Sequence, residues 1–236
     1  MRLSIAIPTF GYEGSGTEFL DCLFRTIEMQ TFKDFEVVVS DHSKDGKLID
    51  VIDVFKSKFD IKYIKNKNDL GNAPANTNNA IRNCSGEIIK VMFQDDFFYE
   101  AQALKKIYDS FDDEHEWLVC GSNHTKNNGK SFYRNIYPKW NNKIIKGVNT
   151  ISSPSVMAAK KKVFDQIKFD ESLVMMMDCE IYYHIKKEFG EPIYLHEILV
   201  SNRIHQDQLS SRYNASSNSS RDLDLEIKYC LSKHLK

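Results

Sequence analysis

The 236-residue sequence lacks long apolar runs, a surplus of one charge and the layout of a signal peptide. Its wholly apolar runs are a few residues long, whereas a membrane-spanning helix needs roughly 20. The chain enters a strand-like pattern at Leu3, without the apolar region of a secretory leader. Lys and Arg number 32 and Asp and Glu 33, so the formal net charge is -1. Because nucleic-acid-binding domains usually carry a basic surplus, we expect no nucleic acid partner.

Cysteine, glycine and proline are also scarce: the chain has 5 Cys, 10 Gly and 5 Pro. The cysteines are scattered and none forms a CxxC pair, which favours reduced thiols in a cytoplasmic protein over a disulfide framework. With 42% hydrophobic residues, the composition excludes collagen-like and disordered chains. We therefore expect a globular cytoplasmic protein whose core needs no covalent or metal cross-links.

Strand-like and helix-like patterns alternate through the first 121 residues. Strand-like runs occupy residues 3–8, 35–39, 61–64, 88–93 and 117–120, and helical spacing of apolar residues occupies 20–27, 48–59, 75–84 and 104–111. Such alternation indicates βαβ units and a mainly parallel central sheet flanked by helices. The predicted fold class is therefore α/β.

The pattern changes in the second half of the chain. Residues 122–150 contain six Lys and Arg residues and no carboxylate, with aromatic side chains interleaved. Beyond them we predict a helix over about 178–189, a strand over 193–200, a Ser- and Asn-rich loop at 214–220 and a closing amphipathic helix at 223–231. We divide the chain into two halves of one domain, 1–121 and 122–210, followed by a terminal loop and helix at 211–236.

Polar side chains follow three of the predicted strands, at the point where each strand ends. Thr9 follows the first strand, Asp41 the second and the pair Asp95-Asp96 the fourth. In open α/β sheets, ligands bind outside the carboxyl ends of the strands. We therefore expect these side chains to meet at one edge of the sheet, which becomes the candidate active site.

The pair Asp95-Asp96 is the sharpest local signal. Adjacent carboxylates repel each other, and such a pair is tolerated where a cation or a ligand hydroxyl lies between them. Their hard oxygens suit Mg²⁺ or Mn²⁺, which commonly bridge a carboxylate to phosphate oxygens. An acidic start to a helix explains the same pair equally well, since carboxylates favour helix amino termini. The local sequence leaves both interpretations open.

Three further residues have a functional and a purely structural interpretation. Asp41 is placed to accept a hydrogen bond from a nucleobase or ribose, but its neighbours are turn formers. Asp178 follows three methionines, whose apolar surroundings would raise its pKa and suit a general base, although aspartate is also a common N-cap. His205 is placed to bind metal or phosphate, although a lone histidine is more often structural. For all three, the local pattern alone favours the structural interpretation.

The basic, aromatic-rich stretch at 122–150 also leaves a choice. Its cations and rings suit an anionic acceptor, a sugar polymer or a membrane surface. A solvated lysine-rich loop explains the same composition, and it is the interpretation that the sequence favours.

Taken together, the motifs resemble glycosyltransferase family 2, the inverting sugar-nucleotide transferases of the GT-A fold. The resemblance covers about residues 1–209 and depends on the order of the motifs more than on any one of them. Its parts are the opening strand at 4–10, the stretch at 30–46, the segments at 68–81 and 85–89, Gln94-Asp95-Asp96 in the place of the metal motif, and the segment at 177–183. It implies a Rossmann-like, mixed and mainly parallel sheet, with the nucleotide-sugar half first and the acceptor-side half second.

The resemblance also implies a role for each site residue. Asp96 would bind the metal on the diphosphate, His205 would complete the metal or diphosphate site, and Asp178 would deprotonate the acceptor hydroxyl. Asp41 would read the edge of the base and Asp95 would hold the ribose or sugar. The full set that would bind the donor is Pro8, Thr9, Phe10, Asp41, Asn78 and Asp95.

The sequence departs from the family pattern at three positions. Gln94 stands where many members have the first aspartate of an Asp-x-Asp motif, so metal affinity would depend more on Asp96. Ser40 replaces the first of two acidic residues after the second strand. Met177 replaces an acidic neighbour of the base and leaves Asp178 as the sole candidate there. None of the three removes a residue that the implied mechanism requires.

The implied activity is transfer of a sugar from a nucleoside-diphosphate donor, with a UDP-sugar favoured, to a hydroxyl of a glycan or lipid-linked saccharide, assisted by Mn²⁺ or Mg²⁺. A lipid-linked acceptor would require peripheral contact with the inner face of the membrane. One alternative is a nucleotide-sugar or glycan-binding protein without turnover, against which the intact Asp96 and Asp178 argue. The other is a sugar nucleotidylyltransferase, which needs a cationic glycine-rich loop, whereas residues 11–16 are glycine-rich without a cation.

Overall fold

The computed structural model describes residues 2–11, 15–208, 211 and 219–235. These residues form an α/β structure in which helices cover a single mixed sheet of nine strands. The predicted α/β class is confirmed. Most of the predicted Ser- and Asn-rich loop at 214–220 lies outside the described residues.

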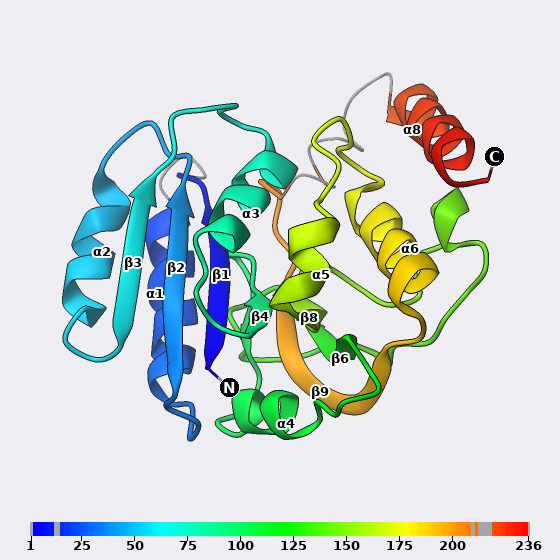
Figure 1. Ribbon diagram of the computed structural model, residues 1–236. Coiled ribbons are helices and arrows are strands. Elements are labelled where there is room, and N and C mark those ends of the chain that lie inside the picture. Colours follow the sequence, from blue (N-terminus) through cyan, green and yellow to red (C-terminus); the bar gives the residue numbers. More distant parts are fainter. Residues whose placement is uncertain (1, 12–14, 209–210, 212–218, 236) are drawn as a thin grey trace.

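The first half of the chain builds the parallel part of the sheet. Its elements are β1 (Leu3–Thr9), α1 (Ser15–Glu28), β2 (Phe35–Asp41), α2 (Lys47–Phe55), β3 (Asp60–Lys65), α3 (Ala73–Arg82), β4 (Ile88–Val91), β5 (Phe97–Phe98) and α4 (Ala103–Asp109). Strands β3, β2, β1 and β4 are neighbours in that order, and the ladders between them are parallel. In Figure 1, α3 lies in front of these strands and α1 behind them. Because both faces are covered, β1 and β2 are buried almost throughout, which explains their apolar sequences.

The second half extends the same sheet, mainly through antiparallel ladders. Its elements are β6 (Trp117–Thr125), β7 (Arg134–Ile136), the 3-10 helices η2 (Ile144–Lys146) and η3 (Pro154–Val156), β8 (Met157–Lys160), α5 (Lys161–Gln166), α6 (Met177–Phe189), β9 (Ile193–Arg203) and α8 (Ser219–His234). Strand β8 pairs antiparallel with both β4 and β6 and so joins the two halves, whereas β9 runs parallel to β6. The sheet order is β3-β2-β1-β4-β8-β6-β9-β5, with β7 beside β6.

The parallel ladders bring the predicted polar segments together. The register of β1 and β2 sets Thr9 opposite Asp41. On the other side of β1, β4 leads directly into Asp95 and Asp96. The arrowheads of β1, β2 and β3 point to one edge of the sheet, at the top of Figure 1. The polar segments therefore meet at the carboxyl edge, as the sequence predicts.

The sequence pattern did not predict several short elements. These are β5, β7, β8 and α5, which span two to six residues and are too short for a periodicity to develop. The last strand runs three residues past the predicted 193–200. Those residues, Ser201, Asn202 and Arg203, are polar and yet at most 4% exposed. A buried polar run at a strand end indicates that the sheet supplies side chains to a site there.

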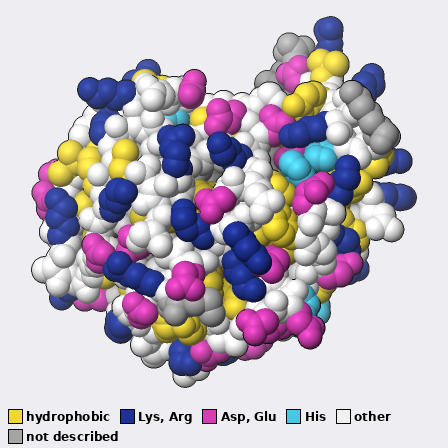
Figure 2. Space-filling view, in the orientation of Figure 1, with side chains coloured by type: hydrophobic (Ala, Val, Ile, Leu, Met, Phe, Trp, Pro, Cys, Tyr) yellow, Lys and Arg dark blue, Asp and Glu magenta, His cyan; other side chains and the backbone are white. Residues whose placement is uncertain are grey.

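Lysine and arginine are mixed with aspartate and glutamate over the face in Figure 2. No broad patch of one sign covers this face. The mixture agrees with the formal net charge of -1 over the whole sequence.

The closing helix α8 holds the segment that leads into α6. The backbone N–H groups of Val174, Met175 and Met176 donate to the Glu226 carboxylate at 3.1, 2.9 and 2.8 Å. Helix α6 itself has no side-chain hydrogen bond from its N-cap, Met176. A residue of α8 therefore fixes the backbone immediately ahead of α6.

We expect Glu226→Gln to lower the free energy of unfolding by about 2 kcal/mol, because an uncharged amide replaces a carboxylate that accepts three backbone hydrogen bonds. Urea unfolding followed by circular dichroism measures the difference. Asp224→Asn, on an exposed position of the same helix, is the matched control. Equal stability of the two variants would contradict the role assigned to Glu226.

Candidate functional site

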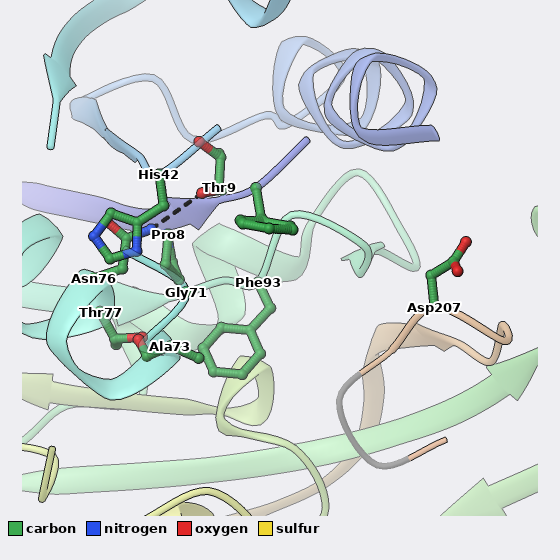
Figure 3. Close-up of a pocket in the computed structure, with 10 residues that line it drawn as sticks. Pro8, Thr9, His42, Gly71, Ala73, Asn76, Thr77, Phe93 and Asp207 are labelled. Carbon is green, nitrogen blue, oxygen red and sulfur yellow. Dashed lines mark hydrogen bonds between the residues drawn. The ribbon is translucent and has the colours of Figure 1, made fainter. Parts of the chain in front are cut away.

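A cavity of about 250 Å³ opens at the carboxyl end of β1. Pro8, Thr9 and Phe10, three of the predicted donor-binding residues, all line it (Figure 3). The remaining lining residues come from the end of β2, from α3 and from loops, and they are His42, Gly71, Ala73, Asn76, Thr77, Phe93 and Asp207. We call this cavity the donor-side pocket.

Polar contacts fix the wall of the donor-side pocket. The backbone N–H of His42 and the side-chain amide of Asn76 both donate to the Thr9 carbonyl, at 3.0 and 3.1 Å. Nε2 of His42 lies 2.8 Å from Nδ2 of Asn66. Burial lowers the pKa of His42, so the imidazole is neutral and Nε2 accepts this hydrogen bond. The sequence reasoning gave neither His42 nor Asn76 a role, although His42 directly follows Asp41 at the predicted edge.

Asp41 lies beneath the pocket and not in its lining. The side chain is fully buried. Oδ1 accepts from the backbone N–H and the hydroxyl of Ser43 at 2.7 and 2.5 Å. Oδ2 accepts from the Tyr63 hydroxyl at 2.8 Å and from the Lys65 ammonium at 2.9 Å. Contact with a nucleobase would require the carboxylate to exchange one of these partners, so the predicted role of Asp41 stays a prediction.

Gln94 and Ser40, two of the departures from the family pattern, form hydrogen bonds that link neighbouring elements. The Gln94 side chain accepts from the backbone N–H of Phe10 at 2.7 Å and donates to the Gly16 carbonyl at 2.5 Å, which ties the turn after β4 to both ends of the loop between β1 and α1. The Ser40 hydroxyl donates to Asn76 at 2.6 Å and accepts from Asn79 at 2.8 Å, which ties β2 to α3. A carboxylate at either position could not make both contacts, because it cannot donate.

Asp95 and Asp96 are both largely buried in the turn after β4. Nε2 of His205 lies 3.0 Å from Oδ2 of Asp95, and the His205 ring packs on Phe19 with 4.7 Å between ring centroids. The structure therefore places His205 beside the acidic pair, on the side of Asp95, and its role at a metal or diphosphate stays a prediction.

Asp96 is held by three donors from the second half of the chain. Oδ2 accepts from the Ser153 hydroxyl at 3.1 Å and from the Asn202 amide at 2.9 Å, and Oδ1 accepts from the backbone N–H of Arg203 at 3.2 Å. Burial and then the charge of Asp95 raise the pKa of Asp96 to about 7. The charge of Asp95 thus acts on Asp96 in the direction expected for adjacent carboxylates.

Asp178 lies in the first turn of α6 and lines a second cavity, of about 360 Å³, together with Asp95 and Asp96. We call it the acid-lined cavity. Burial, with Met175 and Met177 in the same wall, and then the charge of Asp96 raise the pKa of Asp178 to about 7. The direction of this shift is the one expected for an aspartate that follows three methionines. A carboxyl group that titrates near neutral pH can take a proton from a hydroxyl and release it again.

The donor-side pocket and the acid-lined cavity adjoin. The Phe93 side chain, just before the acidic pair, lines both. A ligand that fills the donor-side pocket can therefore extend past this ring toward Asp96 and Asp178.

The loop at 149–155 forms another wall of the acid-lined cavity in a strained conformation. Ser152 has φ of 125°, which L-residues rarely adopt. Its backbone carbonyl accepts from the side-chain amide of Asn149 at 2.9 Å. Its hydroxyl lies 2.9 Å from the Ser122 hydroxyl and donates to Oδ1 of Asn202 at 3.0 Å. These bonds hold the loop so that Ser153 reaches Asp96.

Arg203 is the site residue that sequence reasoning most plainly missed. Its side chain is almost completely buried, and its guanidinium carbon lies 4.5 Å from the centroid of the Phe19 ring. One terminal nitrogen donates to the Asp95 carbonyl at 2.9 Å, while Nε and the other terminal nitrogen have no hydrogen-bond partner among the described residues. Arg203 lines the acid-lined cavity, and its two unpaired nitrogens are buried, so its positive charge lies at the cavity without a carboxylate partner in the described part of the chain. Its nearness to His205 in the chain was the available signal.

Lys90 is a second unpredicted charge near the acidic pair. It is fully buried in β4, and its ammonium donates to the carbonyls of Val91 at 2.8 Å, of Met157 at 3.3 Å and of Ser155. Burial lowers its pKa to about 8, against a smaller opposing effect of the Asp96 charge. A lysine inside an apolar strand was the available sequence signal.

Asn78 is the predicted site residue that the structure places elsewhere. Its amide donates to the Phe169 carbonyl at 2.8 Å and to Glu171 at 2.9 Å, and its carbonyl accepts from the backbone N–H of Phe169 at 3.0 Å. It lines neither the donor-side pocket nor the acid-lined cavity. These contacts fasten α3 to the chain after α5, and the donor-binding role of Asn78 is left as a prediction.

The acidic pair has the chemistry of a site for Mg²⁺ or Mn²⁺. Asp95 and Asp96 offer hard carboxylate oxygens, which these cations prefer. The raised pKa of Asp96 records the cost of its buried negative charge, and a cation would offset that cost. The residues present therefore fit the cation that the family resemblance implies.

The basic stretch at 122–150 contributes one cation to the acid-lined cavity. Arg134 in β7 lines it beside His124, and Arg134 makes no ion pair or side-chain hydrogen bond with any described residue. Tyr133 and Tyr137 nearby in the chain are about half exposed. This part of the stretch borders the cavity, whereas the lysines at 126, 130, 139, 143 and 146 do not line it.

The curated proteins to which this chain is similar are named as glycosyltransferases. GalNAc(5)-diNAcBac-PP-undecaprenol beta-1,3-glucosyltransferase of Campylobacter jejuni is 31% identical over 96 residues, covering 40% of this chain and 30% of that protein. Poly(ribitol-phosphate) beta-N-acetylglucosaminyltransferase TarP of Staphylococcus aureus is 28% identical over 144 residues, covering 59% of this chain and 42% of that protein. The chain thus spans less than half the length of these curated relatives.

Solved structures show the fold. TarS of S. aureus in complex with UDP superposes with a TM-score of 0.69 at 17% identity, covering 99% of this chain and 72% of that one. Mannosyltransferase PcManGT of Pyrobaculum calidifontis, in complex with GDP-Man and Mn²⁺, gives 0.68 at 13% identity, covering 90% and 59%. The fold is that of the GT-A glycosyltransferases, as the sequence resemblance predicts.

None of the helices in the described part of the chain is both long and apolar enough to cross a membrane. The family model for glycosyl transferase family 2 matches residues 4–182, well over half of the sequence. Its match and the GT-A fold agree with the series of motifs that ends at Asp178, and the chain therefore belongs to glycosyl transferase family 2.

Proposed function

We propose that this protein is an inverting glycosyltransferase that moves a sugar from a nucleoside-diphosphate donor to a hydroxyl of a glycan or lipid-linked saccharide. One observation carries the proposal: two cavities share Phe93 in their walls. Thr9 lines one of them, and Asp96 and Asp178 line the other. A two-substrate reaction needs such an arrangement, because much of its rate comes from holding both reactants in line.

The nucleoside would occupy the donor-side pocket, between Pro8, Thr9 and Phe10 on one wall and α3 on the other. UDP is the favoured diphosphate from the family resemblance. In support, TarS has been solved with UDP and with UDP-GlcNAc. The diphosphate would then pass Phe93 toward the acidic pair and toward Arg203, whose positive charge lies in the wall of the same cavity.

Asp96, with Asp95 and His205 beside it, would hold Mn²⁺ or Mg²⁺ against the diphosphate. The cation supplies positive charge against the charge that develops on the departing nucleoside diphosphate. The related fold of PcManGT has been solved with Mn²⁺ and GDP-Man, which supports a cation at such a site. Arg203 would add a second positive charge from the protein itself, stacked on Phe19.

Asp178 would act as general base on the acceptor hydroxyl. Its proton affinity near neutral pH suits the task, and the hydroxyl oxygen would attack the anomeric carbon from the face opposite the diphosphate. The configuration of the sugar therefore inverts. Glu226 would assist indirectly, because it fixes the backbone of Val174, Met175 and Met176 ahead of Asp178.

The acceptor would enter through the acid-lined cavity along Arg134 and the loop at 149–155. Two curated relatives are named for acceptors that carry phosphate, and an unpaired arginine on this wall is compatible with such a group. The two halves of the sheet would thus divide the work, with 1–121 on the donor and 122–210 on the acceptor and base. We place the reaction in the cytoplasm, at the inner face of the membrane when the acceptor is lipid-linked.

Donor class and metal dependence are tested by thermal shift with UDP, dTDP, GDP and CMP, with and without Mn²⁺. We expect one diphosphate to raise the unfolding midpoint, more so with Mn²⁺, according to the ratio of its concentration to its dissociation constant. Asp96→Ala should lose the Mn²⁺-dependent part of the shift. A folded protein that responds to none of the four nucleotides would contradict the proposed donor site.

Asp178→Asn should lower turnover by about 10²–10⁴-fold, because asparagine cannot take the proton from the acceptor. Nucleotide binding should be unchanged. The unfolding midpoint at neutral pH should be equal or higher, since the raised pKa of Asp178 means that its buried charge costs free energy there. Loss of nucleotide binding in this variant would contradict the assignment of Asp178 to the acceptor.

Activity should depend on pH through Asp178. The base works as the carboxylate, and its pKa of about 7 is above the ordinary value, so kcat/KM should rise about tenfold per pH unit below 7 and level off above it. Saturating Mn²⁺ keeps Asp96 ionised and separates its titration from that of Asp178. A profile that stays flat from pH 5 to 8 would contradict the raised pKa.

A further inference from the structure

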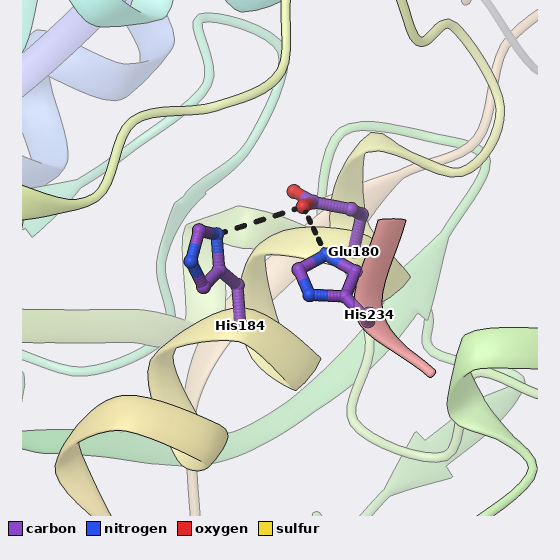
Figure 4. Close-up of side chains that lie close together, drawn as sticks. All are labelled: Glu180, His184 and His234. Atoms are coloured by element: carbon purple, nitrogen blue, oxygen red, sulfur yellow. Dashed lines mark hydrogen bonds and ion pairs between the residues drawn. The ribbon is translucent and has the colours of Figure 1, made fainter. Parts of the chain in front are cut away.

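A second group of potential metal ligands lies on the far side of α6 from Asp178, outside both cavities described above. Glu180 and His184 are four residues apart on α6, a spacing that sets both side chains on one face of a helix. His234 comes from the last turn of α8. In Figure 4 the two imidazole rings point toward the same Glu180 carboxylate.

The distances suit a small cation. Oε1 of Glu180 lies 2.7 Å from Nε2 of His234 and 3.6 Å from Nδ1 of His184. One potential ligand atom from each residue lies within 4.8 Å of the others. Nitrogen and oxygen ligands about 2.0–2.2 Å from a tetrahedral Zn²⁺ lie about 3.3–3.6 Å from each other, so a shift of the His234 ring by less than an ångström would be enough.

Two atoms of the group are left without a hydrogen bond. Oε2 of Glu180 and Nδ1 of His184 are buried and have no hydrogen-bond partner among the described residues. Glu180 is fully buried, and burial also lowers the pKa of His184. A neutral imidazole offers a lone pair to a metal, and an unpaired buried carboxylate oxygen is costly until it finds a cation or a donor.

The charges around the group do not balance. Glu180 and Asp170 are both paired with one ammonium, that of Lys233, at 2.9 and 2.6 Å. The neighbouring thiol of Cys230 has a raised pKa and adds no charge, and the outer residue Glu188 adds another carboxylate. The Lys187 ammonium donates to the backbone carbonyl of His234 at 3.0 Å, so two ammonium groups face three carboxylates. A proton on an imidazole or a bound cation would supply the missing positive charge.

We propose that Glu180, His184 and His234 bind a divalent transition metal ion of the zinc type, which links α6 to α8. One carboxylate and two imidazoles form a ligand set that zinc takes in proteins, with a fourth position left for water. Lys233 would remain on Asp170 when the ion binds. The link would hold α8, and with it Glu226, against the segment that precedes Asp178. This proposal is independent of the proposed transferase activity.

Cobalt titration of the full chain tests the proposal, with nucleotide omitted and metal first removed by a chelator. We expect one Co²⁺ per chain, with the strong visible absorption of a tetrahedral nitrogen and oxygen site, displaced by Zn²⁺. His184→Ala should remove this spectrum, and His234→Ala provides a second, independent loss. His196→Ala, on an exposed position of β9, is the matched control and should leave the spectrum intact.

A substitution of Lys233 should strengthen metal binding instead of removing it. Because its ammonium repels a cation at Oε1 of Glu180, Lys233→Met should bind Co²⁺ more tightly, by about tenfold. Absence of cobalt binding at millimolar concentration would overturn the proposal. Binding that persists in His184→Ala and disappears in Asp96→Asn would also overturn it, because it would belong to the acidic pair after β4.

Discussion

The cost of keeping carboxylates together at a site shielded from water governs the architecture of this protein. Asp96 and Asp178 come from opposite halves of the chain, and each keeps its proton more tightly than an ordinary aspartate because of burial and of a neighbouring carboxylate. The rest of the sheet is arranged to supply the compensating groups.

Most of those groups come from distant parts of the sequence, and only Lys90 lies close to Asp96 in the chain. Ser153 and Asn202 donate to Asp96 from the strained loop and from β9, and Lys90 places an ammonium behind it from β4. On the other side, α8 anchors the residues before Asp178 through Glu226. The antiparallel strand β8, between β4 and β6, is what brings the two sets together. The pairing of β8 with both halves of the sheet is therefore what brings the donors of the second half to the buried carboxylate of Asp96.

Local sequence patterns were sufficient to predict the features that depend on residues adjacent in the chain. The alternation of β-branched and helical segments predicted the parallel half of the sheet, because buried parallel strands are apolar throughout. The methionines before Asp178 predicted its raised pKa, and strand ends predicted where Thr9 and Asp96 would lie. These inferences needed only neighbours in the sequence.

Hydrogen bonds between side chains far apart in the sequence could not be predicted in this way. Nothing near Asp41 indicated that Tyr63 and Lys65, on the next strand, would occupy its carboxylate. Asn78 stood among the residues of a donor-binding segment, yet its amide binds the backbone of Phe169, 91 positions away. Arg203 and Glu226 bind backbone groups of distant residues, and a sequence does not show which backbone group a side chain will meet. Which polar group meets which depends on strand order and loop path, and a single sequence specifies neither directly.

The ring of Phe93 separates the two cavities and belongs to both. A change in its size therefore alters the volume of both cavities at once. If the two cavities hold donor and acceptor as proposed, a substitution at this position changes the preference for both substrates together. Divergence toward a new donor through this residue would then also change the choice of acceptor.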